Sequence, residues 1–379
     1  MSVYAVAAIP VFIWVYLLTA RGGFWRVAHR FAPPSPTVSA RKIVVLIPAR
    51  NEAELIGAAV SSLAQQAFEG SIQIIIIDDG STDGTAEVAV VAANAVGASA
   101  RLTLIRGAAL PHGWSGKLWA LSQGVTAAAV QEPDYFVFTD ADICHGRHSI
   151  ASLVGNAEAH GWDLVSHMVK LSTATFAERL LIPPFVFFFF MVYPPEWIAS
   201  SRYRMAGAAG GCMLIRPQAL AGIGGLKAIR SRIIDDCALA RAVKDAGGRV
   251  WLGLTRDTHS LRAYESSAEI GAMISRTAFS QLGHSYLMLA ATLLGLLCAY
   301  ILPVLLLFAG DAVSIALGGA AVLLMSLCYL PIVRFYGLSP LWSLCLPPIA
   351  LFYLGALIHS ALQYARGRGG KWKGRVQDA

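Results

Sequence analysis

The chain has 379 residues, of which 56% are hydrophobic and only 14% are charged, and its formal net charge is +7 at pH 7. A soluble globular protein carries about 25% charged residues, so we expect part of this chain to lie in a lipid bilayer. The basic residues form no recognition helix, which argues against a nucleic-acid partner, and many flank apolar segments, as contacts with anionic lipid headgroups would require.

The first apolar segment, residues 3–20, is uncharged and just long enough to cross a bilayer. Basic residues follow this segment and do not precede it, so we interpret residues 1–21 as a transmembrane anchor and not as a cleaved signal peptide. The positive-inside rule then places the rest of the chain in the cytoplasm, at a bacterial-type inner membrane. A basic, proline-containing linker, 22–41, is expected next.

From residue 42 to residue 282 the pattern alternates between strands and helices. The expected strands are 43–47, 72–77, 102–105, 135–139 and 164–168, and the expected helices are 52–66, 86–95, 116–130 and 148–160. This βαβ rhythm predicts an α/β domain with one mostly parallel sheet covered by helices.

Two of the expected strands end on carboxylates. The apolar run 74–77 stops at Asp78 and Asp79, and the strand 135–139 stops at Asp140-Ala141-Asp142. Ligands of open α/β sheets bind at the carboxyl ends of the strands. Alternating carboxylates such as Asp140 and Asp142 can both reach one divalent cation and leave coordination positions for phosphate oxygens.

A third acidic pair, Asp235-Asp236, opens an expected helix that runs through Ala246. Acidic residues in a first helical turn are ordinary partners of the helix dipole. A base that deprotonates an alcohol must nevertheless come from somewhere, and this pair is the remaining acidic cluster at the boundary of an element. His145 and His148 follow the Asp140–Asp142 motif closely. One interpretation is that they supply a further metal ligand, and the other is that they are solvated or capping side chains.

A phenylalanine-rich segment between two proline pairs, residues 183–195, is too short to span a membrane. A core position is one interpretation. We favour a segment that dips into the membrane interface or lines an entry for a lipid, with acceptor or membrane contacts made by Phe187, Phe188, Phe189 and Phe190.

Three long apolar runs, 287–309, 312–333 and 341–362, predict about three transmembrane helices within 283–364. A strongly basic tail, 365–379, follows and should be cytoplasmic, whereas three full spans would leave it outside. Either one run is re-entrant, with Pro347-Pro348 breaking the last, or the tail does not follow the rule.

Five motifs in order resemble the family-two glycosyltransferases of GT-A fold, at 47–52, 78–83, 139–142, 210–216 and 235–239. Together with the anchor and the C-terminal helices, they look like the ceramide-glucosyltransferase-like branch. Residues 111–120 and 276–282 are similar to the hopanoid-biosynthesis-associated glycosyltransferases in particular.

The resemblance implies a role for each matching residue. Asp236 would be the catalytic base, with Asp235 in place of the family's glutamate, and Asp140 and Asp142 would hold Mn²⁺ or Mg²⁺. Lys117 would neutralise phosphate, although a solvated lysine is the alternative. The residues implied to bind the UDP-sugar are Pro48, Arg50, Glu52, Asp78, Asp79, Lys117, Asp140, Gly210, Gly211 and Arg276.

In the family, an Arg-Trp pair often follows the base and grips the growing polymer of processive enzymes. The matching stretch here, Arg276–Ser280, lacks that pair. We therefore expect an enzyme that moves one sugar from a UDP-sugar to a lipid hydroxyl, with a hopanoid as the acceptor that the resemblance implies.

A ceramide, a glycerolipid or a polyprenyl phosphate is the alternative acceptor within the same class of enzyme. A membrane transport or scaffold protein with a degenerate sugar-nucleotide domain is the alternative from another class. The intact acidic motifs argue against such degeneration.

Overall fold

The computed structural model describes residues 3–27, 40–367, 371–372 and 375–376 and divides the chain into two compact units. The sheet unit comprises Arg30–Ser172, Trp197–Ala263 and Trp372–Ala379, and the helical unit comprises Met1–His29, Thr173–Glu196 and Tyr264–Lys371. Segments 173–196 and 264–282, which we expected in the catalytic domain, therefore belong to the helical unit. The expected linker and basic tail lie largely outside the described residues.

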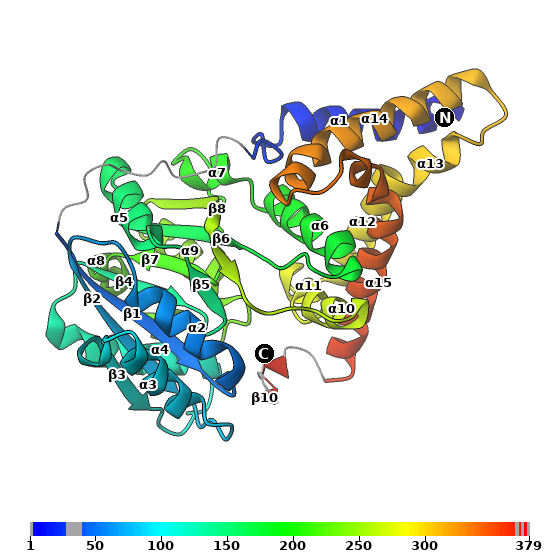
Figure 1. Cartoon of the computed structure of the whole chain (residues 1–379). Coiled ribbons are helices and arrows are strands. Elements are labelled where there is room, and N and C mark those ends of the chain that lie inside the picture. Colours follow the sequence, from blue (N-terminus) through cyan, green and yellow to red (C-terminus); the bar gives the residue numbers. More distant parts are fainter. Residues whose placement is uncertain (1–2, 28–39, 368–370, 373–374, 377–379) are drawn as a thin grey trace. The chain divides into compact units, whose positions relative to one another are not determined.

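An eight-stranded sheet forms the centre of the sheet unit, in the order β3-β2-β1-β4-β7-β6-β8-β5 (Figure 1). The first four strands in this order run parallel, β7 is antiparallel to both of its neighbours, β6 and β8 are parallel, and β5 is antiparallel to β8. Their bounds are β1 Lys42–Ala49, β2 Ser71–Asp78, β3 Leu102–Arg106, β4 Tyr135–Thr139, β5 Ile143–His145, β6 Leu164–Lys170, β7 Cys212–Ile215 and β8 Val250–Ser260.

Helices cover both faces of this sheet because its central strands are apolar on both sides. Ile47 and Ile76 pack in one core with α2 and α3, whereas Leu46 and Ile77 face α4 on the other side. A Cβ at Gly124 of α4 would lie 2.6 Å from Cδ1 of Ile77, so this glycine permits the close approach of helix and strand. The helices are α2 Ala53–Ala64, α3 Thr85–Ala95, α4 Gly116–Ala128, α5 Ser149–His160, α7 Pro195–Ala199, α8 Pro217–Gly222 and α9 Asp235–Asp245.

The predicted α/β architecture is confirmed, and the five expected strands are β1, β2, β3, β4 and β6. The three strands β5, β7 and β8 had not been predicted from the sequence. All three take part in antiparallel pairs, so the half of the sheet beyond β4 is mixed and not purely parallel.

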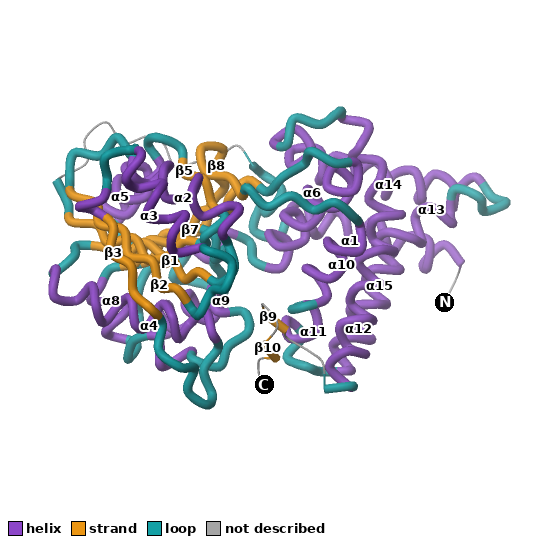
Figure 2. Tube along the Cα trace, turned by 60° about the horizontal axis from the view of Figure 1, so that its bottom comes forward, coloured by secondary structure: helices purple, strands orange, loops and turns teal. Residues whose placement is uncertain are grey.

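The helical unit is built from apolar helices that pack through aromatic side chains. Helix α1 lies alongside α14 (Figures 1 and 2), and its Trp14 donates a hydrogen bond of 2.8 Å from Nε1 to the carbonyl of Ala299. Tyr353 likewise donates to the carbonyl of Leu181, at 2.7 Å. The bounds are α1 Val3–Thr19, α6 Phe176–Val192, α10 Ser267–Ser275, α11 Ala278–Gln281, α12 Tyr286–Leu296, α13 Leu302–Leu306, α14 Ala312–Phe335 and α15 Leu346–Ala365.

Among the residues that the structure describes, three helical segments are long and apolar enough to cross a membrane: Tyr286–Leu306, Ala312–Phe335 and Pro340–Ala365. The N-terminal helix α1, with 17 residues, is shorter. Pro347 and Pro348 lie in the first turn of α15, where the missing N–H costs no helical hydrogen bond. The proline pair therefore does not interrupt the last apolar run in its middle.

We expected the phenylalanine segment to dip into the membrane interface or to line an entry for a lipid. It lies within α6, which continues through Pro183 and Pro184, and both Phe187 and Phe190 are fully buried. The ring of Phe187 packs 5.2 Å from that of Tyr329, measured between centroids. Phe188 and Phe189 are half-buried. Phe187 and Phe190 therefore form part of the core of the helical unit, and Phe187 has a partner from a distant helix of the same unit.

Candidate active site

Two neighbouring strand ends carry turns that are linked by hydrogen bonds. Strands β1 and β2 end together, with Ala49 paired to Asp78. Beyond them, Nη1 of Arg50 donates to the carbonyl of Asp79 at 2.6 Å and lies 3.5 Å from that residue's Oδ2. Further bonds join the turns, among them those from the backbone N–H groups of Asn51, Glu52 and Ala53 to the side chains of Ser81, Thr85 and Asp83, respectively.

The residues expected to bind a nucleotide occupy different positions in these turns. Asp79 is buried beside Arg50, whereas Asp78 accepts a hydrogen bond from the N–H of Ser81. Pro48 is buried within β1. The pairing of β1 with β4 stops at Leu46, before Pro48 is reached. The missing N–H of Pro48 is therefore tolerated in a central strand.

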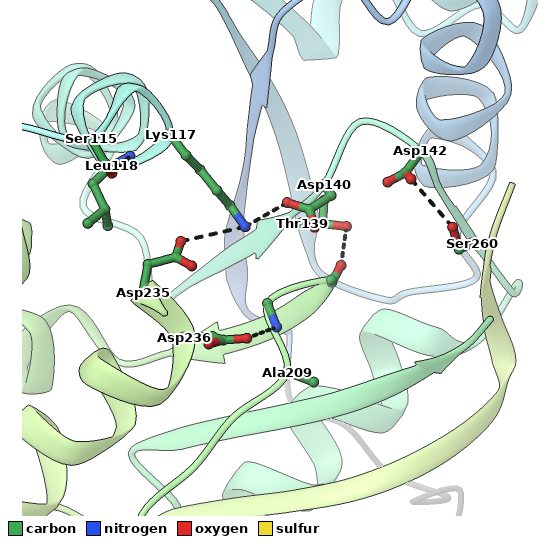
Figure 3. A network of polar contacts seen from close by, with 12 residues as sticks. Ser115, Lys117, Leu118, Thr139, Asp140, Asp142, Ala209, Asp235, Asp236 and Ser260 are labelled. Carbon is green, nitrogen blue, oxygen red and sulfur yellow. Dashed lines mark hydrogen bonds and ion pairs between the residues drawn. The ribbon is translucent and has the colours of Figure 1, made fainter. Parts of the chain in front are cut away.

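Lys117 lies at the centre of the site, between two acidic motifs (Figure 3). Its Nζ is 2.8 Å from Oδ1 of Asp140, at the end of β4, and 3.5 Å from Oδ2 of Asp235, at the start of α9. Ser115 caps α4 by accepting the N–H of Leu118 and thereby fixes the turn from which the lysine projects. Burial alone would lower the pKa of Lys117, but the two carboxylates outweigh it and raise the pKa above its ordinary value.

Asp236 is held by the backbone and not by a cation. Its Oδ2 accepts the N–H of Gly210 at 2.8 Å, and its Oδ1 accepts the N–H of Cys237 at 2.7 Å. Burial and the neighbouring charge of Asp235 raise the pKa of Asp236 to about 6, although Lys117 and the two N–H groups oppose the rise. Such a carboxyl changes its protonation near neutral pH, as a general base requires.

The paired glycines lie at the meeting point of these groups. A Cβ at Gly210 would lie 3.2 Å from Nζ of Lys117 and 3.3 Å from Oδ2 of Asp236. The carbonyl of Gly211 accepts a hydrogen bond from Oγ1 of Thr139 at 2.8 Å. The absence of a side chain at Gly210 therefore lets the lysine and the carboxylate approach one piece of backbone.

The two carboxylates of the Asp140–Asp142 motif point in different directions (Figure 3). Asp140 faces Lys117, whereas Oδ2 of Asp142 lies 2.9 Å from Nε of Arg262 and 3.4 Å from Oγ of Ser260. Burial and the charge of Asp140 raise the pKa of Asp142, against the lowering effect of Arg262.

Arg262 is a residue of this site that we did not predict from the sequence. It follows the end of β8, and its Nη2 lies 2.8 Å from Oε2 of Glu52 and 3.0 Å from Oε1. The unpredicted strand β8 carries it to the acidic turns. Three acidic pairs, two at strand ends and one at a helix start, require nearby cations, and that excess of negative charge was the available signal.

The donor set of the Asp140–Asp142 motif matches a divalent cation with a preference for oxygen. Among the described residues there is no group of three or more His, Cys, Asp or Glu that could hold a metal ion. Two carboxylates on one turn are nevertheless the ligands with which proteins commonly bind Mg²⁺ together with substrate phosphates. In this chain each of them is paired with a cation of the protein, so metal binding requires those pairs to exchange.

Two histidines considered as further ligands have other roles. His145 is buried, with Nε2 3.0 Å from Oγ1 of Thr139 and Nδ1 3.2 Å from Oγ of Ser149. Burial, with smaller contributions from neighbouring histidines, lowers the pKa of His145 to about 3. Both of its nitrogens are therefore engaged within the core. His148 occupies the position before α5 and is exposed.

Some of the expected site residues belong to the helical unit. Arg276 follows α10, is exposed, and lines a pocket of about 780 Å³ together with His359 and Gln363 of α15. The four phenylalanines of the acceptor prediction lie in α6 of the same unit. The sheet unit by itself brings together the remaining candidates, from the β1–α2 turn to Asp236.

The sheet unit, with acidic residues after β2 and β4, has a GT-A-like α/β fold. Residues 44–224 match the family model described as glycosyl transferase family 2.

Curated relatives of this chain are named as glycosyltransferases. Two proteins named 4,4'-diaponeurosporenoate glycosyltransferase, from Staphylococcus aureus strains bovine RF122 / ET3-1 and USA300, are each 31% identical to this chain, over 134 and 135 residues respectively. Each match covers 35% of this chain and 32% of the relative, so the chain spans about a third of the length of these relatives.

A solved structure shows the same fold along nearly the whole chain. It is the mannosyltransferase PcManGT from Pyrobaculum calidifontis, in complex with GDP-Man and Mn²⁺, with a TM-score of 0.58 and 18% identity. The similarity covers 94% of this chain and 98% of that one.

Proposed function

We propose that this protein transfers a single sugar from a UDP-sugar to the hydroxyl group of a membrane lipid, with inversion at the anomeric carbon. One observation carries the proposal: Lys117 joins Asp140 to Asp235, and next to them Asp236 has its pKa raised to about 6. An acidic cluster that holds a lysine, beside a carboxyl whose pKa is raised to about 6, suits a site that binds a diphosphate and deprotonates an alcohol.

Asp236 would act as the base. The acceptor oxygen forms a bond to the anomeric carbon while its proton passes to the carboxylate of Asp236. The bond between the anomeric carbon and the diphosphate oxygen breaks at the same time, and the diphosphate leaves with the electron pair. The N–H groups of Gly210 and Cys237 hold the carboxylate in place for this step.

The donor would occupy the turns after β1, β2 and β4. Arg50, Glu52, Asp78 and Asp79 would form the nucleotide side of the site, and Asp140 and Asp142 the diphosphate side. Lys117 would turn from its carboxylate partners toward the negative charge that develops on the leaving group. A divalent ion, Mn²⁺ or Mg²⁺, held by Asp140 and Asp142 would supply Lewis-acid stabilisation of that charge.

The acceptor would be a lipid, a hopanoid in our proposal, because the described part of the chain includes three helices long and apolar enough to span a membrane. The enzyme would lie in a bacterial inner membrane with its sheet unit in the cytoplasm, where nucleotide sugars are available. The relatives named for 4,4'-diaponeurosporenoate support an apolar acceptor.

A transfer assay tests this proposal. Purified full-length protein in detergent is incubated with labelled UDP-sugars, and in parallel with GDP-sugars, plus a hopanoid polyol, a ceramide, a diacylglycerol or a polyprenyl phosphate. We expect a hopanoid product from a UDP-sugar, with inverted anomeric configuration by NMR. EDTA should stop the transfer, and Mn²⁺ or Mg²⁺ should restore it. Binding of UDP without turnover on any of these lipids would contradict the proposal and favour a non-catalytic membrane protein.

A further inference from the structure

Arg262 forms a bridge between two carboxylates that belong to different turns. Its Nε lies 2.9 Å from Oδ2 of Asp142, and its Nη2 lies within 3.0 Å of both oxygens of Glu52. We call this arrangement, Asp142–Arg262–Glu52, the carboxylate bridge. It connects the turn after β4 with the start of α2.

The backbone holds Arg262 next to this turn. The N–H of Leu261 donates to the carbonyl of Asp142 at 2.8 Å, and the N–H of Arg262 donates to Oγ of Ser260 at 3.2 Å. Ser260 Oγ in turn lies near Oδ2 of Asp142. Any movement that separates Asp142 from the guanidinium can therefore occur in the arginine side chain while its backbone stays in place.

Exposure differs between the partners of the bridge. The side chain of Arg262 is 37% exposed, whereas those of Asp142 and Glu52 are 13% and 12% exposed. The arginine is thus the partner that can swing into solvent. The two carboxylates would be left behind, half-buried and without that counter-charge, which is costly unless another cation replaces it.

We propose that Arg262 is a positioning residue that exchanges partners when the donor binds. Without donor, its guanidinium holds Asp142 and Glu52 in the carboxylate bridge. When a nucleotide diphosphate arrives with a divalent cation, the cation takes Asp142, and the guanidinium turns to the diphosphate, whose oxygens match its planar fork. The inference rests on the proposed function for the identity of the ligand.

This exchange couples the metal to the nucleotide. A divalent ion alone must compete with Arg262 for Asp142, so it binds weakly. A nucleotide diphosphate removes the competitor by offering the guanidinium another anion, so the metal then binds more tightly. Linkage makes the effect reciprocal, and the metal should strengthen nucleotide binding by the same factor.

The test measures Mn²⁺ binding directly, by electron paramagnetic resonance of the free ion, on purified full-length protein without any lipid. Wild type is compared with Arg262→Gln, and Arg256→Gln on β8 serves as the control that removes an exposed arginine from the preceding strand. Without nucleotide, we expect Arg262→Gln to bind Mn²⁺ about tenfold more tightly than wild type, an effect typical of linked sites. With UDP, and separately with GDP, the gain in Mn²⁺ affinity should be smaller in Arg262→Gln than in wild type.

A permanent structural bridge would give the opposite result. The Mn²⁺ affinity of Arg262→Gln without nucleotide would then equal that of wild type or be weaker. The single substitution Asp142→Asn would also leave the Mn²⁺ affinity of the protein unchanged. Because loss of the bridge can destabilise the fold, Arg262→Lys provides a second variant. Its ammonium is a single point charge that cannot hold both carboxylates as a fork does, so we expect a Mn²⁺ affinity between those of wild type and Arg262→Gln.

Thermal unfolding gives an independent readout. Mn²⁺ should raise the melting temperature of Arg262→Gln more than that of wild type, and equal shifts would contradict the exchange. None of these measurements involves turnover or a lipid. Failure of the exchange therefore leaves the proposed transfer reaction intact, and failure of the transfer assay leaves the exchange testable.

Discussion

Lys117 Nζ lies 2.8 Å from Oδ1 of Asp140, and this ion pair connects the start of α4 to the end of β4. Asp235 is the second partner of the ammonium, at 3.5 Å, so one largely buried cation contacts carboxylates from two motifs that are far apart in the sequence. The pair links the expected diphosphate site to the expected base.

Lys117→Met should lower kcat/KM by about 10²-fold or more, because a buried cation aimed at developing negative charge is among the larger contributions to catalysis. Lys117→Arg should retain part of the activity. The control is Lys227→Met, which removes an exposed lysine from the same unit. Steady-state kinetics with saturating acceptor checks the result, and equal kcat/KM for Lys117→Met and wild type would remove the lysine from the reaction.

The rate of transfer should fall as the pH drops through about 6. Asp236 accepts a proton only in its ionised form, and burial together with Asp235 raises the pKa of Asp236 to about 6. Asp235→Asn removes the neighbouring negative charge, so the acidic limb of the kcat/KM profile should move to lower pH. Lys117→Met removes an opposing positive charge and should move the residual limb to higher pH. A limb that stays in place in both variants would assign the titration to another group.

Gly210→Ala should reduce kcat by about tenfold or more, since reactions depend steeply on the placement of the groups involved. The added methyl group would lie 3.2 Å from Nζ of Lys117 and 3.3 Å from Oδ2 of Asp236, closer than ordinary contacts. Gly222→Ala is the matched control, because a Cβ at Gly222 meets nothing within 4 Å. Indistinguishable kcat values for the two variants would show that the close approach at Gly210 is not needed.

The acidic strand ends were predictable because local signals mark them. The apolar run before Asp78 and the strand before Asp140 each indicate a buried strand, and the carboxyl ends of parallel strands meet at one edge. The ion pair between Lys117 and Asp235 was not predictable in this way. It depends on the tertiary structure that brings the start of α4 to the start of α9, and no spacing in the sequence encodes that contact.

Two parts of the structure differed from expectation for physical reasons. The strand β8, which brings Arg262 to the site, belongs to the mixed half of the sheet, where the βαβ rhythm no longer applies. Phe187 is as apolar as a residue that contacts lipid, but it is buried against Phe24 and Tyr329, which are far from it in the chain. Local hydrophobicity cannot distinguish a membrane surface from the core of an apolar helical unit.

Phe187→Ala should lower the free energy of unfolding of the helical unit by about 3 kcal/mol, the cost typical of removing a phenylalanine side chain from a protein core. Phe176→Ala provides the control, because that side chain is 71% exposed. Thermal unfolding in detergent should give a lower midpoint for Phe187→Ala only. A stable Phe187→Ala variant with a raised KM for the lipid would instead restore the acceptor-contact interpretation of this residue.

The most direct test of the proposed mechanism compares Asp236→Asn with Asp235→Asn in the purified full-length enzyme. Loss of a general base typically costs about 10²–10⁴ in rate. Asp236→Asn should therefore lose kcat by a factor in this range while UDP affinity stays near wild type, because the change is isosteric and one of the two N–H groups of Gly210 and Cys237 keeps the amide oxygen as its acceptor. Asp235→Asn, which removes a partner of Lys117, should be milder and affect mainly donor binding. An Asp236→Asn enzyme with substantial kcat, beside an inactive Asp235→Asn enzyme, would contradict the account and make Asp235 the base.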